Sequence, residues 1–360
     1  MKDYSIYFPN YSIGPNVYQN ISNICSPYGR RIIAIGGKQA IAAAKESLLE
    51  AICDSDLTIT DFIIYGTEAS YENVECLMQM ESVHQADMIF AIGGGKALDT
   101  CKCLSVKLQK PIFTFPTIAS TCAACTTVSI MYRMDGTFLE PFFFSTPPIH
   151  TFIHTAIIAK APTKFLWAGM GDTYAKHYES TVSTRGDVLE HFNALGVGMS
   201  RMCVDPILRY GKKALSDNAN QIASYELEQT VLAIIVTTAL VSILVTTEHT
   251  VDYNSGLAHA IFYALTSFPV IEERHLHGEV VGFGVLILLL VDQQMQEFET
   301  LYRFNQSIGL PTKLSDLEIT KEEFESILPT IVAMPDLRHY AYPVTIEMLK
   351  KAYERLENNS

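Results

Sequence analysis

The sequence predicts two domains, a parallel α/β sheet domain over residues 1–161 and an all-helical domain over residues 162–360. Three observations predict this fold class. Short β-type runs alternate with helical runs through the first part of the chain, which is typical of parallel strand pairing. From Pro162 onward, long helical segments dominate. A chain of 360 residues also has the usual length of two domains.

The first domain is expected to contain four strands that alternate with helices. The strands are predicted over residues 31–35, 62–65, 88–92 and 112–115, and the helices over residues 39–52, 71–85 and 97–108. Two of these strands end in glycines, at Gly36-Gly37 and at Gly93-Gly94-Gly95. Ligands of parallel sheets bind outside the carboxyl ends of the strands, which is where these glycines lie.

The second domain is expected to be helical throughout. Helices are predicted over residues 163–180, 219–247, 255–265, 278–297, 321–334 and 345–356, with prolines between several of them. A sheet domain followed by a helical domain implies a cleft between the two, which is a common place for an active site.

Composition and charge exclude several classes of protein. A hydrophobic fraction of 48% with 18% charged residues argues against disorder. The formal net charge of −13 makes nucleic acid and anionic lipid unfavourable partners. The longest uncharged apolar stretch, residues 231–247, is at the short limit for a membrane span and is predicted to be a buried helix.

The cysteines and the N-terminus indicate a cellular location. Residues 1–5 lack the apolar core of a signal peptide. The eight cysteines are scattered, unlike the dense pattern of a small secreted scaffold. We therefore expect a cytoplasmic protein with reduced thiols and a small-molecule substrate.

A glycine-rich loop follows the third predicted strand and reads Gly93-Gly94-Gly95-Lys96-Ala97-Leu98-Asp99-Thr100. Its glycines let the backbone approach a ligand, and the helix N-terminus offers unpaired N–H groups to a pyrophosphate. The loop is neither a P-loop nor a G-x-G-x-x-G fingerprint, so by itself it is equally consistent with a tight turn. Lys96 favours an anionic ligand, because a lysine at a helix start opposes the macrodipole.

Three side chains further along suit a divalent metal. Asp172 follows Gly169-Met170-Gly171, which is predicted to open a helix, so its carboxylate would stand at the helix N-terminus. His259 lies in an apolar segment, and His277 lies in His275-Leu276-His277-Gly278-Glu279. One carboxylate and two imidazoles hold a divalent ion and leave a position open for a substrate.

The spacing of these residues does not show that they lie close together. Each histidine taken alone is more simply a core or surface residue held by hydrogen bonds. Nearby competitors are His249, His275 and Glu279, of which the last two have the pattern of solvated residues or of residues that support a ligand from behind. His177 is a weak candidate for a proton donor and is more simply a helix-surface residue.

The order of the motifs is more specific than any one of them. Between about Ile32 and Gly284 the chain carries, in order, G-G-G-K-x-x-D-T, P-T-I-A-S-T, G-x-G-D, A-H-A and H-G-E. This order resembles the iron-containing alcohol dehydrogenase superfamily and, within it, the glycerol dehydrogenase group. The resemblance implies a Rossmann-like first domain, a helical second domain, a nicotinamide cofactor and one catalytic divalent metal, with zinc expected and iron as the alternative.

The resemblance also assigns roles to residues. The implied metal ligands, which would also be catalytic, are Asp172, His259 and His277. The residues implied for the pyrophosphate and nicotinamide side of the cofactor are Gly94, Gly95, Lys96 and Asp99. Those implied for the adenine end are Thr117 and Ser120, and further cofactor-lining positions are Thr126, Val128 and Tyr132.

Three positions depart from the glycerol dehydrogenase pattern. Cys122 replaces an aspartate that contacts the polyol, and Phe262 replaces a histidine three positions after His259. Without that aspartate, an anionic substrate such as a 2-oxo acid is easier to admit. Gly37 replaces an aspartate that binds the adenine ribose, and Lys38 would pair with a ribose 2′-phosphate, so NADP(H) is expected as well as NAD(H).

Two short patterns resemble the hydroxycarboxylate dehydrogenase branch of the group, which reduces short 2-oxo acids and prefers NADPH. They are Thr121-Cys122-Ala123-Ala124 and Gly171-Asp172-Thr173 with Ala175-Lys176. The expected function is therefore a metal-dependent oxidoreductase acting on a small secondary alcohol and its ketone, with a 2-hydroxy acid and 2-oxo acid as the expected pair. Cys122 and Cys125 form a C-x-x-C, which is redox-active, half of a zinc site or, as we expect, a pair of small residues lining the substrate mouth.

Other functions fit parts of the sequence. An NAD-dependent glycerol dehydrogenase has the same metal residues, although Cys122 and Phe262 count against it. Dehydroquinate synthase is a lyase of the same fold, but it needs many basic and polar residues around the metal, whereas residues 257–262 are apolar apart from His259. An inactive relative kept as a binding protein would not need all three metal residues. Relatives are often dimers or larger assemblies, so a homo-oligomer is expected.

Overall fold

The computed structural model describes residues 3–246 and 253–359 of the chain. The chain divides into two compact units. The first unit contains Met1–Thr163 together with Ser216–Val231, and the second contains Lys164–Leu215 together with Leu232–Ser360. Each unit is described by itself.

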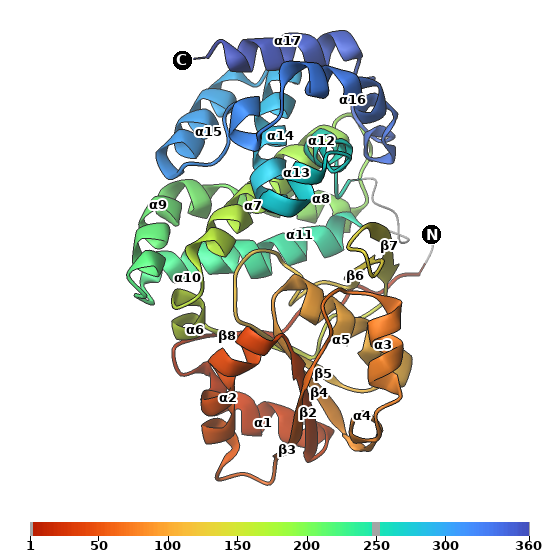
Figure 1. Ribbon diagram of the computed structural model, residues 1–360, viewed down its shortest axis with the longest axis vertical. Helices are drawn as coiled ribbons and strands as arrows, with labels where there is room; N and C mark the ends of the chain where they lie inside the picture. The colour runs from red at the N-terminus through yellow and green to blue at the C-terminus, as the bar shows by residue number, and fades with distance from the viewer. Residues whose placement is uncertain (1–2, 247–252, 360) are drawn as a thin grey trace. The chain divides into compact units, whose positions relative to one another are not determined.

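The first unit is built on a parallel sheet of six strands in the order β1-β8-β5-β4-β2-β3 (Figure 1). The four predicted strands are confirmed as β2 (Arg31–Gly36), β3 (Thr58–Ile64), β4 (Met88–Gly93) and β5 (Ile112–Pro116). Two strands were not predicted, namely β1 (Tyr11–Gly14) and β8 (His150–His154). β1 has four residues, and β8 is no shorter than the predicted strand β5 but begins and ends in histidine.

Helices cover both faces of this sheet (Figure 1). On one face, α1 (Ile21–Cys25) and α2 (Lys38–Ile52) pack in one core cluster with alternate residues of β2, β4 and β5. On the other face lies α5 (Gly95–Leu108), whose buried Cys101 donates to the carbonyl of Ile35. The predicted helix over residues 71–85 is two helices, α3 (Tyr71–Met78) and α4 (Glu81–Gln85), because Met80 has an extended backbone.

The remaining elements of the first unit are short. β6 (Val128–Tyr132) and β7 (Phe138–Phe143) form an antiparallel hairpin, which was not predicted. α6 (Thr155–Ala159) follows β8. Short 3-10 turns cover Val17–Asn20 and Ser26–Tyr28.

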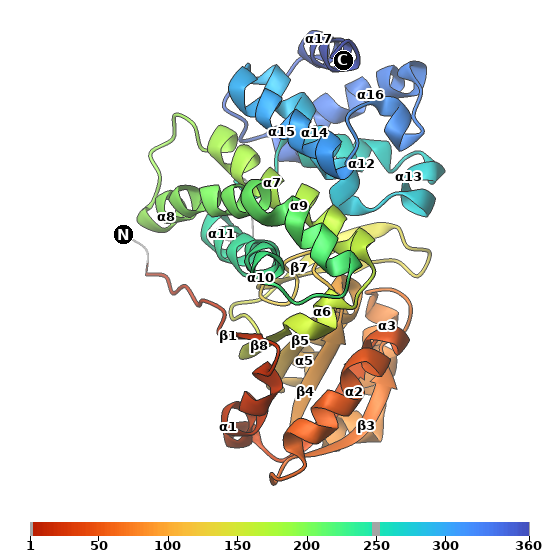
Figure 2. The same ribbon diagram turned by 90° about the vertical axis from the view of Figure 1, so that its left-hand side faces the viewer.

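The second unit is helical, as predicted, and is arranged around α14 (His277–Val291) (Figures 1 and 2). Every residue of α14 from Gly278 to Val291 is buried, which makes it a core helix that is apolar on all sides. The other helices are α7 (Thr163–Ser183), α8 (His191–Met199), α9 (Asp205–Ala219), α10 (Tyr225–Leu232), α11 (Thr238–Val245), α12 (Leu257–Leu265), α13 (Pro269–Arg274), α15 (Met295–Ile308), α16 (Lys321–Ala333) and α17 (Ile346–Glu357). Of these, α9 ends within the first unit, and α10 belongs to the first unit except for Leu232.

Two of the predicted helices have different boundaries. The predicted helix over residues 278–297 ends at Val291, because Gln293 adopts a left-handed backbone with φ of 58° that a helix does not accommodate. The predicted helix over residues 219–247 starts at Tyr225 and contains a π-helical turn at Ala233–Thr237. Residue 247 lies outside the described residues.

Among the described residues, one helical stretch, Tyr225–Val245, is long and apolar enough to cross a membrane. Within its most apolar window, 67% of the stretch is buried inside the structure, as in the core helix of a soluble protein. Length and composition alone are therefore weak support for a membrane span here.

Candidate metal centre

Asp172 lies in the middle of α7 and not at a helix start, so the predicted N-terminal position was wrong. The glycines before it serve close helix packing. A Cβ atom on Gly171 would lie 2.0 Å from the carbonyl oxygen of Gly278, and one on Gly278 would lie 2.0 Å from that of Ala168. Glycine at both positions lets the backbones of α7 and α14 touch, which brings Asp172 next to the start of α14.

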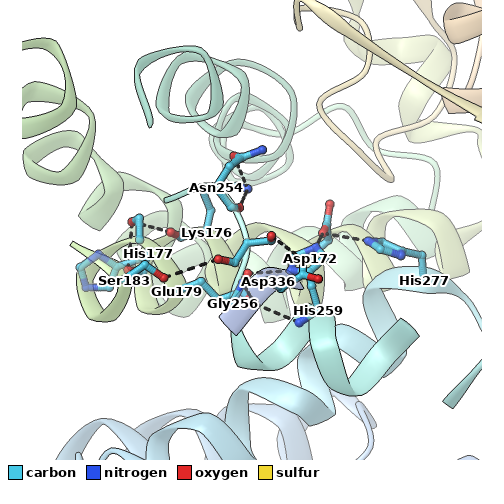
Figure 3. Close-up of polar contacts among 12 residues, drawn as sticks. Asp172, Lys176, His177, Glu179, Ser183, Asn254, Gly256, His259, His277 and Asp336 are labelled. Atoms are coloured by element: carbon cyan, nitrogen blue, oxygen red, sulfur yellow. Dashed lines mark hydrogen bonds and ion pairs between the residues drawn. The ribbon is translucent and has the colours of Figure 1, made fainter. Parts of the chain in front are cut away.

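Three ligand atoms meet at this helix crossing (Figure 3). Asp172 Oδ1 lies 3.3 Å from His277 Nε2 and 3.7 Å from His259 Nε2. One possible ligand atom from each residue lies within 4.8 Å of the others. The structure thus brings together, from α7, α12 and α14, the three residues that the sequence suggested, and their donor set suits a divalent ion.

Behind His259 lies a residue that the sequence analysis missed. Glu179 is fully buried, and its Oε2 lies 2.6 Å from His259 Nδ1. Glu179 comes seven residues after Asp172, two turns along the same face of α7. The spacing could therefore have pointed to Glu179, because a metal-bound histidine usually donates the N–H of its second ring nitrogen to a carboxylate, a backbone carbonyl or water.

The electrostatics of the cluster favour a positive charge between the two carboxylates. Burial raises the pKa of the Asp172 carboxyl, but hydrogen bonds with His259 and His277 outweigh burial and hold that pKa well below its usual range. Burial lowers the pKa of His259, but the charge of Glu179 and the bond with Asp172 raise it to about 10. A metal ion bound here would therefore compete with a proton for the same position.

The neighbouring candidates have other roles. Glu279 is buried and accepts from the N–H of Leu276, which caps α14, while its other oxygen lies 2.9 Å from His275 Nδ1. Of the two interpretations offered for His275 and Glu279, solvated residues is therefore wrong, because they contact each other at the start of α14. Phe262 packs its ring at 82° against that of His277, with centroids 4.4 Å apart. His249 lies outside the described residues.

His177 is not placed to donate a proton at neutral pH. Its Nδ1 lies 2.7 Å from Ser200 Oγ. Burial, and then the charge of Arg201, lower the pKa of His177 to about 4. The ring is therefore neutral and engaged in a structural hydrogen bond.

This shift predicts a pH dependence of stability. The unfolded chain takes up a proton at His177 below pH 6.5, while the folded protein resists it down to about pH 4. His177 thus contributes to the loss of unfolding free energy as the pH falls between these values. Urea unfolding of metal-free protein at several pH values should give a flatter profile for His177→Asn than for the parent. Parallel profiles would contradict the assignment.

The residues suggested for the cofactor lie on adjacent strands of the first unit. Gly37 caps α2 after β2, the glycine loop follows β4, and Thr117 follows β5, so all three are at the carboxyl edge of the sheet. The N–H of Thr117 donates to Gly93, which ties two of these turns together. Gly94 and Gly37 leave the first turns of α5 and α2 without a side-chain cap, an arrangement that suits a pyrophosphate.

Other cofactor candidates already have partners within the protein. Lys96 pairs with Glu68 at 2.7 Å, so a carboxylate supplies the anion that its position at a helix start requires. Asp99 is buried and pairs with Lys102 at 2.9 Å, and the same ammonium donates to Thr126 Oγ1 and to the carbonyl of Val128. This network fixes the β6 strand, which also carries Tyr132, against α5. Lys38 is exposed and Ser120 is half-buried.

The two cysteines of the C-x-x-C pair are not joined by a disulfide. Cys122 is half-buried, whereas Cys125 is buried with its Sγ 3.3 Å from Thr151 Oγ1. Burial raises the pKa of Cys125 to about 11, which makes it a poor nucleophile. The turn is closed by the N–H of Cys125 donating to the carbonyl of Cys122.

Comparison with known proteins assigns the chain to a family. A family model described as iron-containing alcohol dehydrogenase matches residues 9–147. Glycerol dehydrogenase from Thermotoga maritima is 34% identical over 74% of this chain and 71% of its own length. The chain belongs to the iron-containing alcohol dehydrogenase family. The resemblance drawn from the order of the motifs is thereby confirmed.

Other family members support the same placement. Hydroxycarboxylate dehydrogenase A from Escherichia coli is 32% identical over 91% of this chain and 90% of its own. The fold matches the crystal structure of glycerol dehydrogenase from Schizosaccharomyces pombe, with a TM-score of 0.84 at 23% identity, over 99% of this chain and 91% of that one. The chain is therefore a dehydrogenase of the iron-containing alcohol dehydrogenase family that acts on a CH–OH group. This family uses a nicotinamide cofactor and a metal, and the three donor atoms described above fit a metal.

Proposed function

We propose that this dehydrogenase reduces a short 2-oxo acid to a 2-hydroxy acid, using NADPH and a divalent metal held by Asp172, His259 and His277. The convergence of these three side chains on one point carries the proposal. Zinc is the expected ion, since a carboxylate and two imidazoles leave a fourth position open for the substrate oxygen.

The chemistry divides between the protein and what it binds. When bound, the metal would supply Lewis acidity toward the substrate oxygen, and the nicotinamide would supply the hydride. Reduction of the ketone to the alcohol would use that hydride and one proton from solvent. Within the chain, Asp172 provides the negative charge of the ligand set, and the ring of Phe262 shields His277 from water on one side.

Two features favour an anionic substrate. Cys122 stands where polyol enzymes of the group carry an aspartate, so a repulsive charge is missing. Lys176 lies one turn after Asp172 on α7, is buried, and donates to Oδ1 and the backbone oxygen of Asn254. A fixed ammonium on the ligand-bearing helix favours a substrate carboxylate. The relationship to a hydroxycarboxylate dehydrogenase along 91% of the chain points the same way.

The proposed preference for NADPH depends on the turn after β2. Gly37 presents no carboxylate to a ribose phosphate, and a Cβ atom there would meet only Tyr65, at 3.8 Å. Lys38 is exposed at the start of α2, where its ammonium is free to approach a 2′-phosphate. We further propose that the enzyme acts in the cytoplasm as a homo-oligomer, without nucleic-acid or membrane partners.

A second candidate is NAD-dependent oxidation of glycerol, because several glycerol dehydrogenases are among the relatives, one of them 34% identical. The two candidates differ in substrate charge and in cofactor phosphate. They share the metal centre.

Initial rates of zinc-loaded protein separate the two. NADPH and NADH are each combined with 2-oxobutyrate, 2-oxoglutarate and dihydroxyacetone, and nicotinamide absorbance is followed. We expect kcat/KM with NADPH and a 2-oxo acid to exceed that with NADH and dihydroxyacetone by at least about tenfold, or about 1.4 kcal/mol. The reverse preference would identify a glycerol dehydrogenase and would overturn the substrate argument from Cys122.

A further inference from the structure

Glu179 is the buried residue whose carboxylate is most fully engaged at the metal centre (Figure 3). Its Oε1 accepts from two backbone N–H groups, those of Gly256 and His259, at 2.9 Å each. Its Oε2 lies 2.6 Å from His259 Nδ1. A single carboxylate on α7 therefore holds both the first turn of α12 and the imidazole ring which that turn carries.

These contacts decide which nitrogen of His259 carries the proton. An ionised carboxylate can only accept hydrogen bonds, so the short contact with Oε2 requires a hydrogen on Nδ1. In the neutral ring the lone pair is then on Nε2, the atom that faces Asp172 Oδ1 at 3.7 Å. The ring is thus held in the tautomer that can bind a metal at this point.

We propose that Glu179 is the positioning residue of the metal centre, fixing the tautomer and orientation of His259 so that Nε2 is the metal ligand. This inference rests on the proposed metal site. Glu179 also adds a second negative charge beside Asp172, so that two carboxylates balance one dication in a buried place.

The first turn of α12 depends on Glu179 for its cap. α12 begins at Leu257 after Gly256, whose lack of a side chain leaves the helix without a cap of its own. A Cβ atom at Gly256 would lie 3.4 Å from Glu179 Cβ, so the two segments are already in close contact. The capping carboxylate is that of Glu179 on α7, and the same side chain contacts the ring of His259 in the first turn of α12.

Glu179→Gln tests the proposal with almost no change of shape. The glutamine oxygen can accept from the two backbone N–H groups, which leaves its NH₂ facing Nδ1. That NH₂ donates, so Nδ1 must accept, and the hydrogen moves to Nε2, where it blocks the metal. The opposite amide orientation would set NH₂ against two N–H donors and is disfavoured.

The measurement is the zinc Kd of the full-length protein, obtained by competition with a chromophoric chelator. We expect Glu179→Gln to weaken zinc binding by about 10- to 100-fold. Asp336→Asn is the matched control, because Asp336 accepts from Ser255 Oγ at 2.6 Å beside the same turn, whereas the carboxylate that contacts His259 Nδ1 is that of Glu179. This variant should bind zinc within about twofold of the parent.

A second readout separates positioning from a general loss of structure. Long-range ¹⁵N–¹H spectra of histidine-labelled protein, at equal zinc concentration, should show the hydrogen of His259 on Nδ1 in the parent and on Nε2 in Glu179→Gln. An Nδ1 hydrogen in both proteins with equal zinc Kd values would overturn the role of Glu179. If the parent bound no zinc, the proposed metal-dependent function would be contradicted. That result is distinguishable from one in which zinc binds but Glu179 has no effect on its binding.

Discussion

His277→Ala should abolish metal binding and turnover together. His277 supplies one of the three ligand atoms that meet at the α7–α14 crossing, and alanine leaves an aspartate and one histidine. Two ligands hold zinc far more weakly than three, and catalysis loses the charge stabilisation that the ion supplies. We expect kcat/KM to fall by about three orders of magnitude and bound zinc, measured by elemental analysis after dialysis, to fall below about a tenth of the parent value.

His275→Gln is the control for this variant. His275 lies two residues earlier, and its Nδ1 contacts Glu279 and not Asp172. Glutamine can still donate to that carboxylate, so zinc content and turnover should stay within about threefold of the parent. Near-parental activity in His277→Ala would disprove the metal assignment, and equal losses in both variants would indicate damage to the start of α14.

Gly171→Ala should disrupt the centre without touching a ligand. The new methyl group would lie 2.0 Å from the carbonyl oxygen of Gly278, which is backbone and cannot swing away. α7 and α14 must therefore separate, which moves Asp172 away from His277. We expect a loss of about 3 kcal/mol in unfolding free energy of the metal-free protein, together with a zinc Kd raised at least about tenfold.

Gly198→Ala provides the matched control in a helix of the same unit. Gly198 is exposed on α8, and a Cβ atom there meets nothing within 4 Å. Alanine is the better helix former, so stability should rise by up to about 1 kcal/mol and the zinc Kd should not change. Chemical denaturation and the zinc titration of the two glycine variants, side by side, measure both effects. If the Gly171→Ala protein were as stable as the parent, α7 and α14 would be able to accommodate a methyl group at this contact, and the argument from close packing would be contradicted.

The sequence predicted the fold class because the buried strands are apolar runs, two of which end in glycine, and they alternate with helical segments. β4 and β5 are buried along their whole length, β2 is buried after Arg31, and all three strands were found. The edge strand β1 and the β6–β7 hairpin were missed, since short, half-buried segments carry no clear period. The π-helical turn at Ala233–Thr237 likewise has no sequence signal.

At the candidate site, sequence reasoning found the ligands but misjudged how they are held. The order of the motifs selected Asp172, His259 and His277, although their separation along the chain says nothing about distance. Gly171 was taken for part of a helix start, because glycine near a helix usually marks an end. Its actual role depends on Gly278, about a hundred residues away, and only the folded chain shows that contact. Glu179 was missed for a related reason, since its partner is on another helix.

The first compact unit is not a continuous piece of chain, because it includes Ser216–Val231. Asn218 in that segment donates its side-chain N–H groups to the carbonyls of Ile158, Ala159 and Ala161, which close the end of α6. During synthesis these carbonyls lack the contact with Asn218 until more than fifty further residues have been added to the chain. A fragment cut near residue 161 would keep all six strands of the sheet but lack this closure, and its newly exposed surface would favour aggregation.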